Sequence, residues 1–294
     1  MWKIAAVLLL VFVALGAESC HRQEQQKLVI GSKFFTEQVV LAELLAQHIE
    51  ARTGVGVERK SNLGGTLLVH KAMLSGKLDL YVEYTGTALL AVLGERATGD
   101  SKAVYQRARD EYGKRFNLEV TEPLGFENTF AMVVRRVDAQ QYHLAKISDI
   151  VPLAPLWRPG VGYEFLERVD GYKGWTERYG LKFGKPPSEL DLGLLYRALA
   201  EKKVDIVAGN STDGLIESLG LVPLQDNLRY FPPYDAVPIV RRDALERVPG
   251  LRAALAEIGG KISVEDMRHM NFEVDGNQRD VATVVKEFRA NKGL

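Results

Sequence analysis

Residues 79–87, D-L-Y-V-E-Y-T-G-T, decide the fold of this chain, because they read as a strand that runs directly into a sharp turn. Leu80 and Val82 alternate with their neighbours at the two-residue period of a β-strand. Gly86 permits the turn, and an adjacent threonine is able to cap a following helix. Tyr84 is therefore expected at the carboxyl end of a strand, where open α/β sheets bind their ligands.

A second stretch repeats this pattern later in the chain. Residues 203–213, K-V-D-I-V-A-G-N-S-T-D, align with residues 77–87. The alignment sets Asn210 against Tyr84, and each stretch follows an amphipathic helical pattern. The chain is therefore predicted to form two similar α/β lobes, each with a polar loop at the end of a strand. A cleft between two such lobes would hold a small molecule.

Length and composition agree with two globular lobes. The chain has 294 residues, against about 100–200 residues for a typical domain, and 46% of it is apolar. Lysine and arginine together number 38, as do aspartate and glutamate, so the formal net charge is zero. Without a basic surplus, nucleic acid is not an expected partner. A neutral or zwitterionic small ligand remains open.

The first twenty residues have the pattern of an export signal and are not expected in the fold. Lys3 precedes an apolar run, residues 4–16, that is too short to span a membrane. Cys20 follows the run and is the only cysteine, so no internal disulfide is expected. The pattern predicts a bacterial lipoprotein that is lipidated at Cys20 and held in the periplasm or on the outer face of the membrane. A plain signal peptide is the alternative.

The chain is expected to cross twice between the lobes. After a polar tether at residues 21–26, residues 27–132 and 235–294 are assigned to the first lobe and residues 133–234 to the second. The crossings fall near the strand pattern at residues 131–135 and near the proline-stiffened aromatic loop at residues 230–235. Two crossings make a hinge rather than a flexible linker. C-terminal helices are expected at residues 245–258, 264–271 and 279–290.

Two helix starts carry candidate ligand contacts. Thr36 is predicted to cap a helix over residues 37–52, whose first turn contains Gln38 near backbone amides that favour negative charge. The glycine loop N-L-G-G-T at residues 62–66 opens another helix at Thr66. A purely capping role is the alternative for Gln38 and Thr66.

Five motifs occur in order along the chain: I-G-S-K-F-F-T-E-Q at 30–38, N-L-G-G-T at 62–66, Y-V-E-Y-T-G-T at 81–87, S-T-D-G at 211–214 and F-P-P-Y-D at 231–235. Together they resemble the substrate-binding proteins of glycine betaine/carnitine/choline ABC importers, from about residue 27 to the C-terminus. The resemblance implies a two-lobed periplasmic-binding-protein fold of type II, like a venus flytrap. It also implies capture of an extracytoplasmic ligand and its delivery to a membrane permease driven by an ATPase.

The resemblance further implies a cage of aromatic rings around a trimethylammonium group. Such a cation has no hydrogen to donate, so ring faces attract it, at roughly 0.5–2 kcal/mol for each contact. Tyr84 and Tyr234 match aromatic positions of the family, whereas Phe130 and Asn210 stand where tyrosine is usual. Thr87 and Gln38 match polar positions near the other end of the ligand. Roles without a ligand are a strand cap for Tyr84, hinge packing for Tyr234, core packing for Phe130 and capping for Thr87.

The sequence contains no pattern typical of catalysis, of a metal site or of a cofactor. The histidines are scattered, with no zinc spacing, and there is no phosphate-binding loop or dinucleotide fingerprint. The leading hypothesis is therefore a monomeric solute-binding protein, with a periplasmic enzyme or a sensory ligand-binding module on the same scaffold as the alternative. Trp157 and Trp175 are candidates for a missing cage wall or for ordinary packing. The ligand stays open among glycine betaine, proline betaine, carnitine, choline and ergothioneine.

Overall fold

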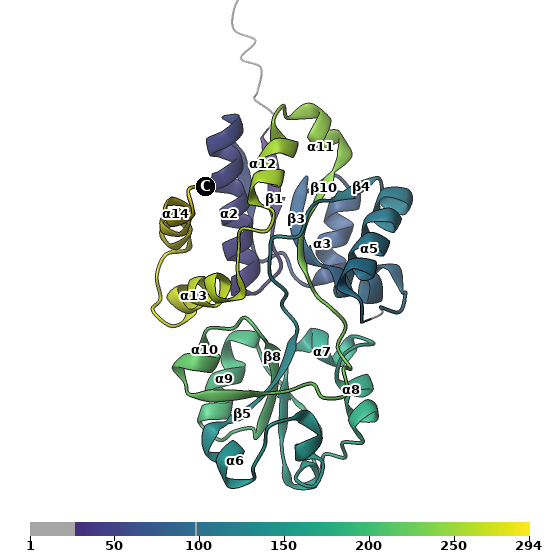
Figure 1. Cartoon of the computed structure of the whole chain (residues 1–294), viewed down its shortest axis with the longest axis vertical. Coiled ribbons are helices and arrows are strands. Elements are labelled where there is room, and N and C mark those ends of the chain that lie inside the picture. Colours follow the sequence, from purple (N-terminus) through teal and green to yellow (C-terminus); the bar gives the residue numbers. More distant parts are fainter. Residues whose placement is uncertain (1–26, 98) are drawn as a thin grey trace, which may run out of the picture.

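The computed structural model describes residues 27–97 and 99–294, and it consists of two α/β lobes, one above the other in Figure 1. The predicted signal segment, the tether at residues 21–26 and Cys20 lie outside the described residues. No helix in the described part of the chain is long and apolar enough to cross a membrane.

The first lobe is built on a mixed five-stranded sheet with the order β2-β1-β3-β10-β4. Its parallel strands are β1 (Leu28–Gly31), β2 (Val57–Lys60) and β3 (Leu80–Tyr84). Strand β10 (Ala236–Arg241) returns from the second lobe and lies antiparallel between β3 and β4 (Leu118–Val120).

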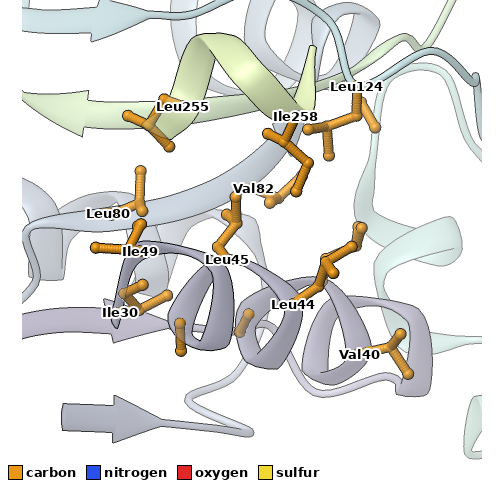
Figure 2. Packing of buried hydrophobic residues seen from close by; sticks show 14 of the residues in the cluster. Ile30, Val40, Leu44, Leu45, Ile49, Leu80, Val82, Leu124, Leu255 and Ile258 are labelled. Atoms are coloured by element: carbon orange, nitrogen blue, oxygen red, sulfur yellow. The ribbon is translucent and has the colours of Figure 1, made fainter. Parts of the chain in front are cut away.

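Helices cover both faces of this sheet, so the first lobe has two hydrophobic cores. The alternation in β3 explains the division, because Leu80 and Val82 point into one core and Tyr81 into the other. Figure 2 shows Leu45 and Ile49 of the long helix α2 packed against Leu80 and Val82. The helical elements of this lobe are α2 (Thr36–Thr53), α3 (Thr66–Leu74), α4 (Thr85–Thr87), the π-helix η1 (Ala88–Leu93), α5 (Ser101–Phe116), α11 (Arg242–Arg247), α12 (Leu251–Ile258), α13 (Val264–Asp275) and α14 (Val281–Lys292).

The second lobe has its own five-stranded sheet with the order β7-β6-β8-β5-β9. Its strands are β5 (Phe130–Arg135), β6 (Pro159–Val161), β7 (Ser188–Glu189), β8 (Ile206–Asn210) and β9 (Leu221–Leu224). The helical elements are α6 (Arg136–Gln141), η2 (Ile147–Ile150), η3 (Ala154–Leu156), α7 (Tyr163–Glu167), α8 (Tyr172–Tyr179), α9 (Leu192–Ala200) and α10 (Leu215–Ser218). Trp157 and Trp175 are buried in its core.

The two repeated stretches occupy equivalent places in the two sheets. Strand β3 lies between parallel β1 and antiparallel β10, and strand β8 lies between parallel β6 and antiparallel β5. Tyr84 and Asn210 each end their strand. The sequence repeat therefore reflects a repeat in topology, and both strand ends face the space between the lobes.

Some boundaries differ from those that the sequence predicts. The pattern assigns residues 130–132 to the first lobe, whereas β5 begins at Phe130 and pairs there with Asn210 of the second sheet. The single helix expected at residues 245–258 is two helices, because Pro249 follows α11 and Gly250 has a φ of 84°.

Thr36 is the first residue of helix α2 and not its N-cap. The N-cap position is taken by Phe35, which gives no side-chain hydrogen bond to the helix. The Thr36 hydroxyl instead donates to Asp275 Oδ1 at 2.6 Å, so it joins the first turn of α2 to the end of α13.

Candidate functional site

A cavity of about 340 Å³ lies between the lobes and receives side chains from both. Its size falls within the range of about 300–1,000 Å³ that is usual for small-molecule sites. Most of its wall comes from strand ends and from the loops that follow them. The lining residues are Lys33, Phe34, Phe35, Tyr84, Thr87, Asn128, Phe130, Gly162, Tyr163, Glu164, Phe165, Arg168, Glu189, Leu190, Asp191, Leu192, Leu194, Ala208, Asn210 and Tyr234.

The fold brings most of the predicted ligand contacts to this cavity, and those that line it are Tyr84, Thr87, Phe130, Asn210 and Tyr234. The rings of Phe130 and Tyr234 meet edge to face, with centroids 5.9 Å apart and planes at 81°. The Tyr84 ring stacks beside Phe35 at 6.4 Å. Phe35 lines the same wall, although the sequence patterns do not single it out.

The Y-T-G-T and F-P-P-Y-D motifs interlock at the hinge. A Cβ atom on Gly86 would lie 2.6 Å from the Pro233 carbonyl oxygen and 2.8 Å from the Tyr234 ring. Only glycine therefore allows the second crossing to approach this closely. The Thr85 hydroxyl accepts a hydrogen bond from the Asp235 amide at 3.1 Å, which fixes the crossing against the end of β3.

Gln38 and Thr66 do not line the cavity. Gln38 is buried behind the wall, and its Nε2 donates to the Tyr84 hydroxyl at 3.1 Å. Thr66 is also buried, and its hydroxyl accepts from the Lys33 ammonium at 3.1 Å. The Thr66 amide donates across the cleft to Glu164 Oε1 of the second lobe at 2.8 Å. Gln38 therefore positions the wall residue Tyr84, and Thr66 positions Lys33 and contributes to the contact between the lobes.

Lys33 is a buried cation in the wall. Its side chain is 3% exposed, pairs with Glu83, and places the ammonium 5.0 Å from the centre of the Tyr84 ring. One face of Tyr84 therefore already meets a cation that belongs to the protein. The signal in the sequence is a lysine two residues after the end of strand β1, within the I-G-S-K motif.

Arg168 provides a second cation on the opposite lobe. Its guanidinium carbon lies 5.4 Å from the centre of the Phe130 ring. Nε and Nη2 donate to the two oxygens of Asp170 at 2.8 and 2.5 Å, and Asp170 also accepts from the Tyr234 hydroxyl at 2.5 Å. Among the described residues, Nη1 has no hydrogen-bond partner, although the side chain is only 9% exposed. One donor of this largely buried side chain is therefore left available at the wall.

Glu37 lies behind Tyr84 and carries no ion pair within the described part of the chain. The Tyr84 hydroxyl donates to its Oε1 at 2.6 Å. Burial raises the pKa of Glu37, while hydrogen bonds from four side chains oppose that rise. Desolvation also raises the pKa of the Tyr84 hydroxyl well above its usual value, so Tyr84 remains a neutral donor.

In residues 27–97 and 99–294, no group of three or more His, Cys, Asp or Glu side chains is arranged to hold a metal ion. Of the acidic residues of the cavity wall, Glu164 lies on α7, whereas Glu189 and Asp191 lie close together between the end of β7 and the start of α9.

Two α/β lobes joined by two crossings, with an aromatic and polar cavity between them, define a solute-binding protein of the type II periplasmic-binding-protein fold. Residues 26–291 match the family described as the substrate-binding domain of the ABC-type glycine betaine transport system. The chain belongs to this family. As a substrate-binding protein of ABC importers it acts outside the cytoplasm.

Similar proteins agree with this assignment. A carnitine transport binding protein of Listeria monocytogenes is 35% identical over 261 residues, which cover 88% of this chain and 84% of that protein. A glycine-betaine-binding protein of Pseudomonas aeruginosa is 30% identical, with 95% and 92% covered. The crystal structure of a glycine betaine/carnitine/choline ABC transporter has a TM-score of 0.77 at 31% identity, with 91% and 99% covered. These relatives are transport proteins and not enzymes.

Proposed function

We propose that this chain binds a zwitterionic quaternary ammonium compound, a betaine that carries a carboxylate, and delivers it to an ABC permease. The observation that carries this proposal is the free Nη1 of Arg168 in a wall that also presents aromatic rings. A carboxylate accepts a hydrogen bond from such a donor more strongly than the neutral hydroxyl of choline does.

The two cations of the wall, Lys33 and Arg168, would donate hydrogen bonds to the carboxylate of a ligand without repelling its ammonium group. Lys33 is paired with Glu83 and Arg168 with Asp170, so each pair is close to neutral. Each pair still offers N–H groups, which a carboxylate accepts strongly. The trimethylammonium group would then rest on the ring surfaces of Tyr84, Tyr234 and Phe35 that remain open. This division of the cavity favours betaines over choline.

Asn210 supports a betaine with a tail larger than that of glycine betaine. It lines the main cavity and also a neighbouring one of about 290 Å³. Phe34, Phe35 and Leu192 line both as well, so the two spaces adjoin. The side chain of Asn210 makes no hydrogen bond within the described residues, which leaves its amide free for a ligand. A tyrosine at this place would fill part of the passage.

The remaining parts of the proposal concern attachment and assembly. The chain acts as a monomer, anchored by lipid on Cys20 and in contact with a permease subunit. Expression of a Cys20→Ala variant in a bacterial host should release the protein from the membrane fraction. If the variant remains in that fraction like the unchanged protein, the lipid anchor is excluded.

Calorimetry with a panel of glycine betaine, proline betaine, carnitine, ergothioneine and choline tests the ligand class. We expect at least one carboxylate-bearing member to bind with a Kd at least tenfold lower than that of choline, since a hydrogen bond to a charged group contributes about 1.5–3 kcal/mol. Tighter binding of choline than of every betaine would overturn the proposed polarity of the site. Binding of none of the five would overturn the ligand class.

A further inference from the structure

The carboxylate of Glu37 joins the ligand cavity to the contact between the lobes. Its side chain is fully buried at the start of α2 and accepts hydrogen bonds from donors on four separate segments. A buried carboxylate is costly unless such donors compensate it. A purely structural core position would be filled at lower cost by an apolar side chain. The positions of these four donors indicate the role of the Glu37 carboxylate.

The two oxygens of Glu37 face different parts of the molecule. Oε1 accepts from the Tyr84 hydroxyl at 2.6 Å and from Asn128 Nδ2 at 2.9 Å, and both of these residues line the ligand cavity. Oε2 accepts from the Thr212 hydroxyl at 2.5 Å and from Asn271 Nδ2 at 3.2 Å. Thr212 follows β8 in the second lobe, and Asn271 lies on α13 of the first.

The loop that contains Thr212 is held by the first lobe at several points. Asn271 Nδ2 also donates to the Thr212 carbonyl at 3.0 Å, and Arg268 Nε donates to the Ser211 carbonyl at 2.9 Å. A Cβ atom on Gly214 would lie 2.6 Å from the backbone nitrogen of Phe272 on α13. The S-T-D-G motif is therefore the surface by which the second lobe docks on α13, and Figure 1 shows α13 directly above α10.

We propose that Glu37 is a positioning residue that couples ligand contact at Tyr84 to the docking of residues 211–214 on the first lobe. This inference deepens the proposed function and rests on it for the identity of the ligand. When the docked loop is held, Asn210 at its start faces the same cavity as Tyr84. When Thr212 moves away from Glu37, the carboxylate loses a hydrogen-bond donor. The hydrogen bonds by which Glu37 positions Tyr84 and Asn128 then change as well. Ligand contact and lobe docking therefore stabilise each other.

Substitutions at Thr212 test the coupling without touching the cavity wall. Thr212→Val keeps the shape of the side chain and removes the one hydroxyl that Glu37 receives from the second lobe. Thr212→Ser keeps the hydroxyl. Thr176→Val is the matched control, because the Thr176 hydroxyl bonds only to the Lys173 carbonyl of its own helix. Gly214→Ala is a second variant that obstructs docking by a different route.

Stopped-flow kinetics with the tightest-binding member of the betaine panel give the first readout. We expect Thr212→Val to raise Kd about tenfold, mainly through faster dissociation, and Thr212→Ser and Thr176→Val to stay within about twofold of the unchanged protein. In a double-mutant cycle, Tyr84→Phe should cost less affinity in the Thr212→Val background than alone, since both hydroxyls act on Glu37. Additive effects, or an unchanged Kd in Thr212→Val and Gly214→Ala, would overturn the inference.

Small-angle scattering of the ligand-free variants gives a readout that does not depend on the ligand. Thr212→Val should have a larger radius of gyration than Thr212→Ser at equal thermal stability. If the unchanged protein binds no member of the panel, the proposed function fails, and this comparison still decides whether Glu37 holds the lobes together. Equal radii for the two variants would exclude that role.

Discussion

The guanidinium carbon of Arg168 lies 5.4 Å from the centre of the Phe130 ring, so this ring supports an arginine of its own lobe. Phe130 also contacts Phe165 at 4.8 Å between centroids and Tyr234 at 5.9 Å. A phenylalanine in place of the usual tyrosine therefore has a physical role, because its ring places Arg168 at the wall without adding a hydroxyl that needs a partner.

Removal of the Arg168 guanidinium should weaken the binding of betaines more than the binding of choline. The Arg168→Met variant loses the free Nη1 and leaves Asp170 with only the Tyr234 hydroxyl among the donors described above. We expect about a 10- to 100-fold loss of affinity for a betaine, in line with a hydrogen bond to a charged group. Calorimetry with both ligands is the measurement, with Arg178→Met on the exposed side of α8 as the control. Equal losses for both ligands would contradict the assignment.

Tyr84 and Tyr234 should each contribute ring contacts to binding, so replacement by alanine should cost about 1–3 kcal/mol of binding free energy. Tyr84→Phe keeps the ring face but removes a hydroxyl that donates to Glu37 and accepts from Gln38. We therefore expect Tyr84→Phe to lower the free energy of unfolding by about 1–3 kcal/mol, because a buried polar group loses its partner. Urea denaturation measures the second effect and calorimetry the first. Unchanged affinity in both alanine variants would end the proposal of an aromatic cage.

Asn210→Tyr tests whether the passage to the neighbouring cavity is used. The backbone amide of Asn210 is held by the Tyr196 hydroxyl at 3.0 Å and by Asp213 Oδ2 at 3.1 Å, so a new side chain leaves the strand end in place. We expect glycine betaine to bind more tightly and a larger betaine such as ergothioneine to bind more weakly. Calorimetry with both ligands gives the ratio, and a shift of both affinities in the same direction would argue against a larger native ligand.

Gly65→Ala should hinder closure of the cleft. A Cβ atom there would lie 2.4 Å from Glu164 Oε1, which accepts the Thr66 amide across the cleft. With a saturating betaine, we expect the unchanged protein to become more compact in small-angle scattering and the variant to become less so. Gly193→Ala is the control, because nothing lies within 4 Å of its added Cβ. Equal compaction in both variants would show that this contact is not needed for closure.

Asp213 should make stability fall as pH rises. Burial raises its pKa from 3.8 to about 7, although the Tyr196 hydroxyl and the Asn210 amide oppose the rise. The folded protein then keeps a proton that the unfolded chain releases, so the free energy of unfolding decreases between about pH 4 and pH 7. Burial raises the pKa of Glu37 and Asp275 in the same direction.

The contribution of Asp213 is separated by comparison with Asp213→Asn, which is neutral at every pH. Urea denaturation gives the free energy of unfolding at pH 5 and at pH 8. The change between the two pH values should be smaller in the variant by on the order of 1–4 kcal/mol. An identical pH dependence in both proteins would mean that Asp213 does not titrate in this range.

The sequence was sufficient to predict the repeated strand ends, because alternating apolar residues and a following turn are local features. Tyr84 and Asn210 could be paired on that ground alone, and the structure gives them equivalent places. Lys33 and Arg168 could not be found in this way. Their roles depend on carboxylates and rings that fold against them, such as Glu83, 50 residues further along the chain.

Gln38 illustrates a different limit. A helix start and a polar side chain are both visible in the sequence, but the direction of the side chain depends on how α2 packs on β3. The amide points to the Tyr84 hydroxyl behind the wall rather than into the cavity. Thr36 likewise bonds to Asp275, 239 residues away, instead of capping its own helix. Contacts of this range become visible only when the sheet order is known.

The docking of residues 211–214 on α13 has a practical consequence for sensor engineering. Arg268 is exposed on α13, and its Nε donates to the Ser211 carbonyl of the other lobe, outside the cavity wall. An environment-sensitive fluorophore at the exposed neighbour His269 would leave this hydrogen bond in place and would report opening and closing of the cleft without contact with the bound molecule. A C-terminal fusion that disturbs α13 or α14 should be avoided for the same reason. Such a tag would change the docking of residues 211–214 and would therefore change the measured uptake.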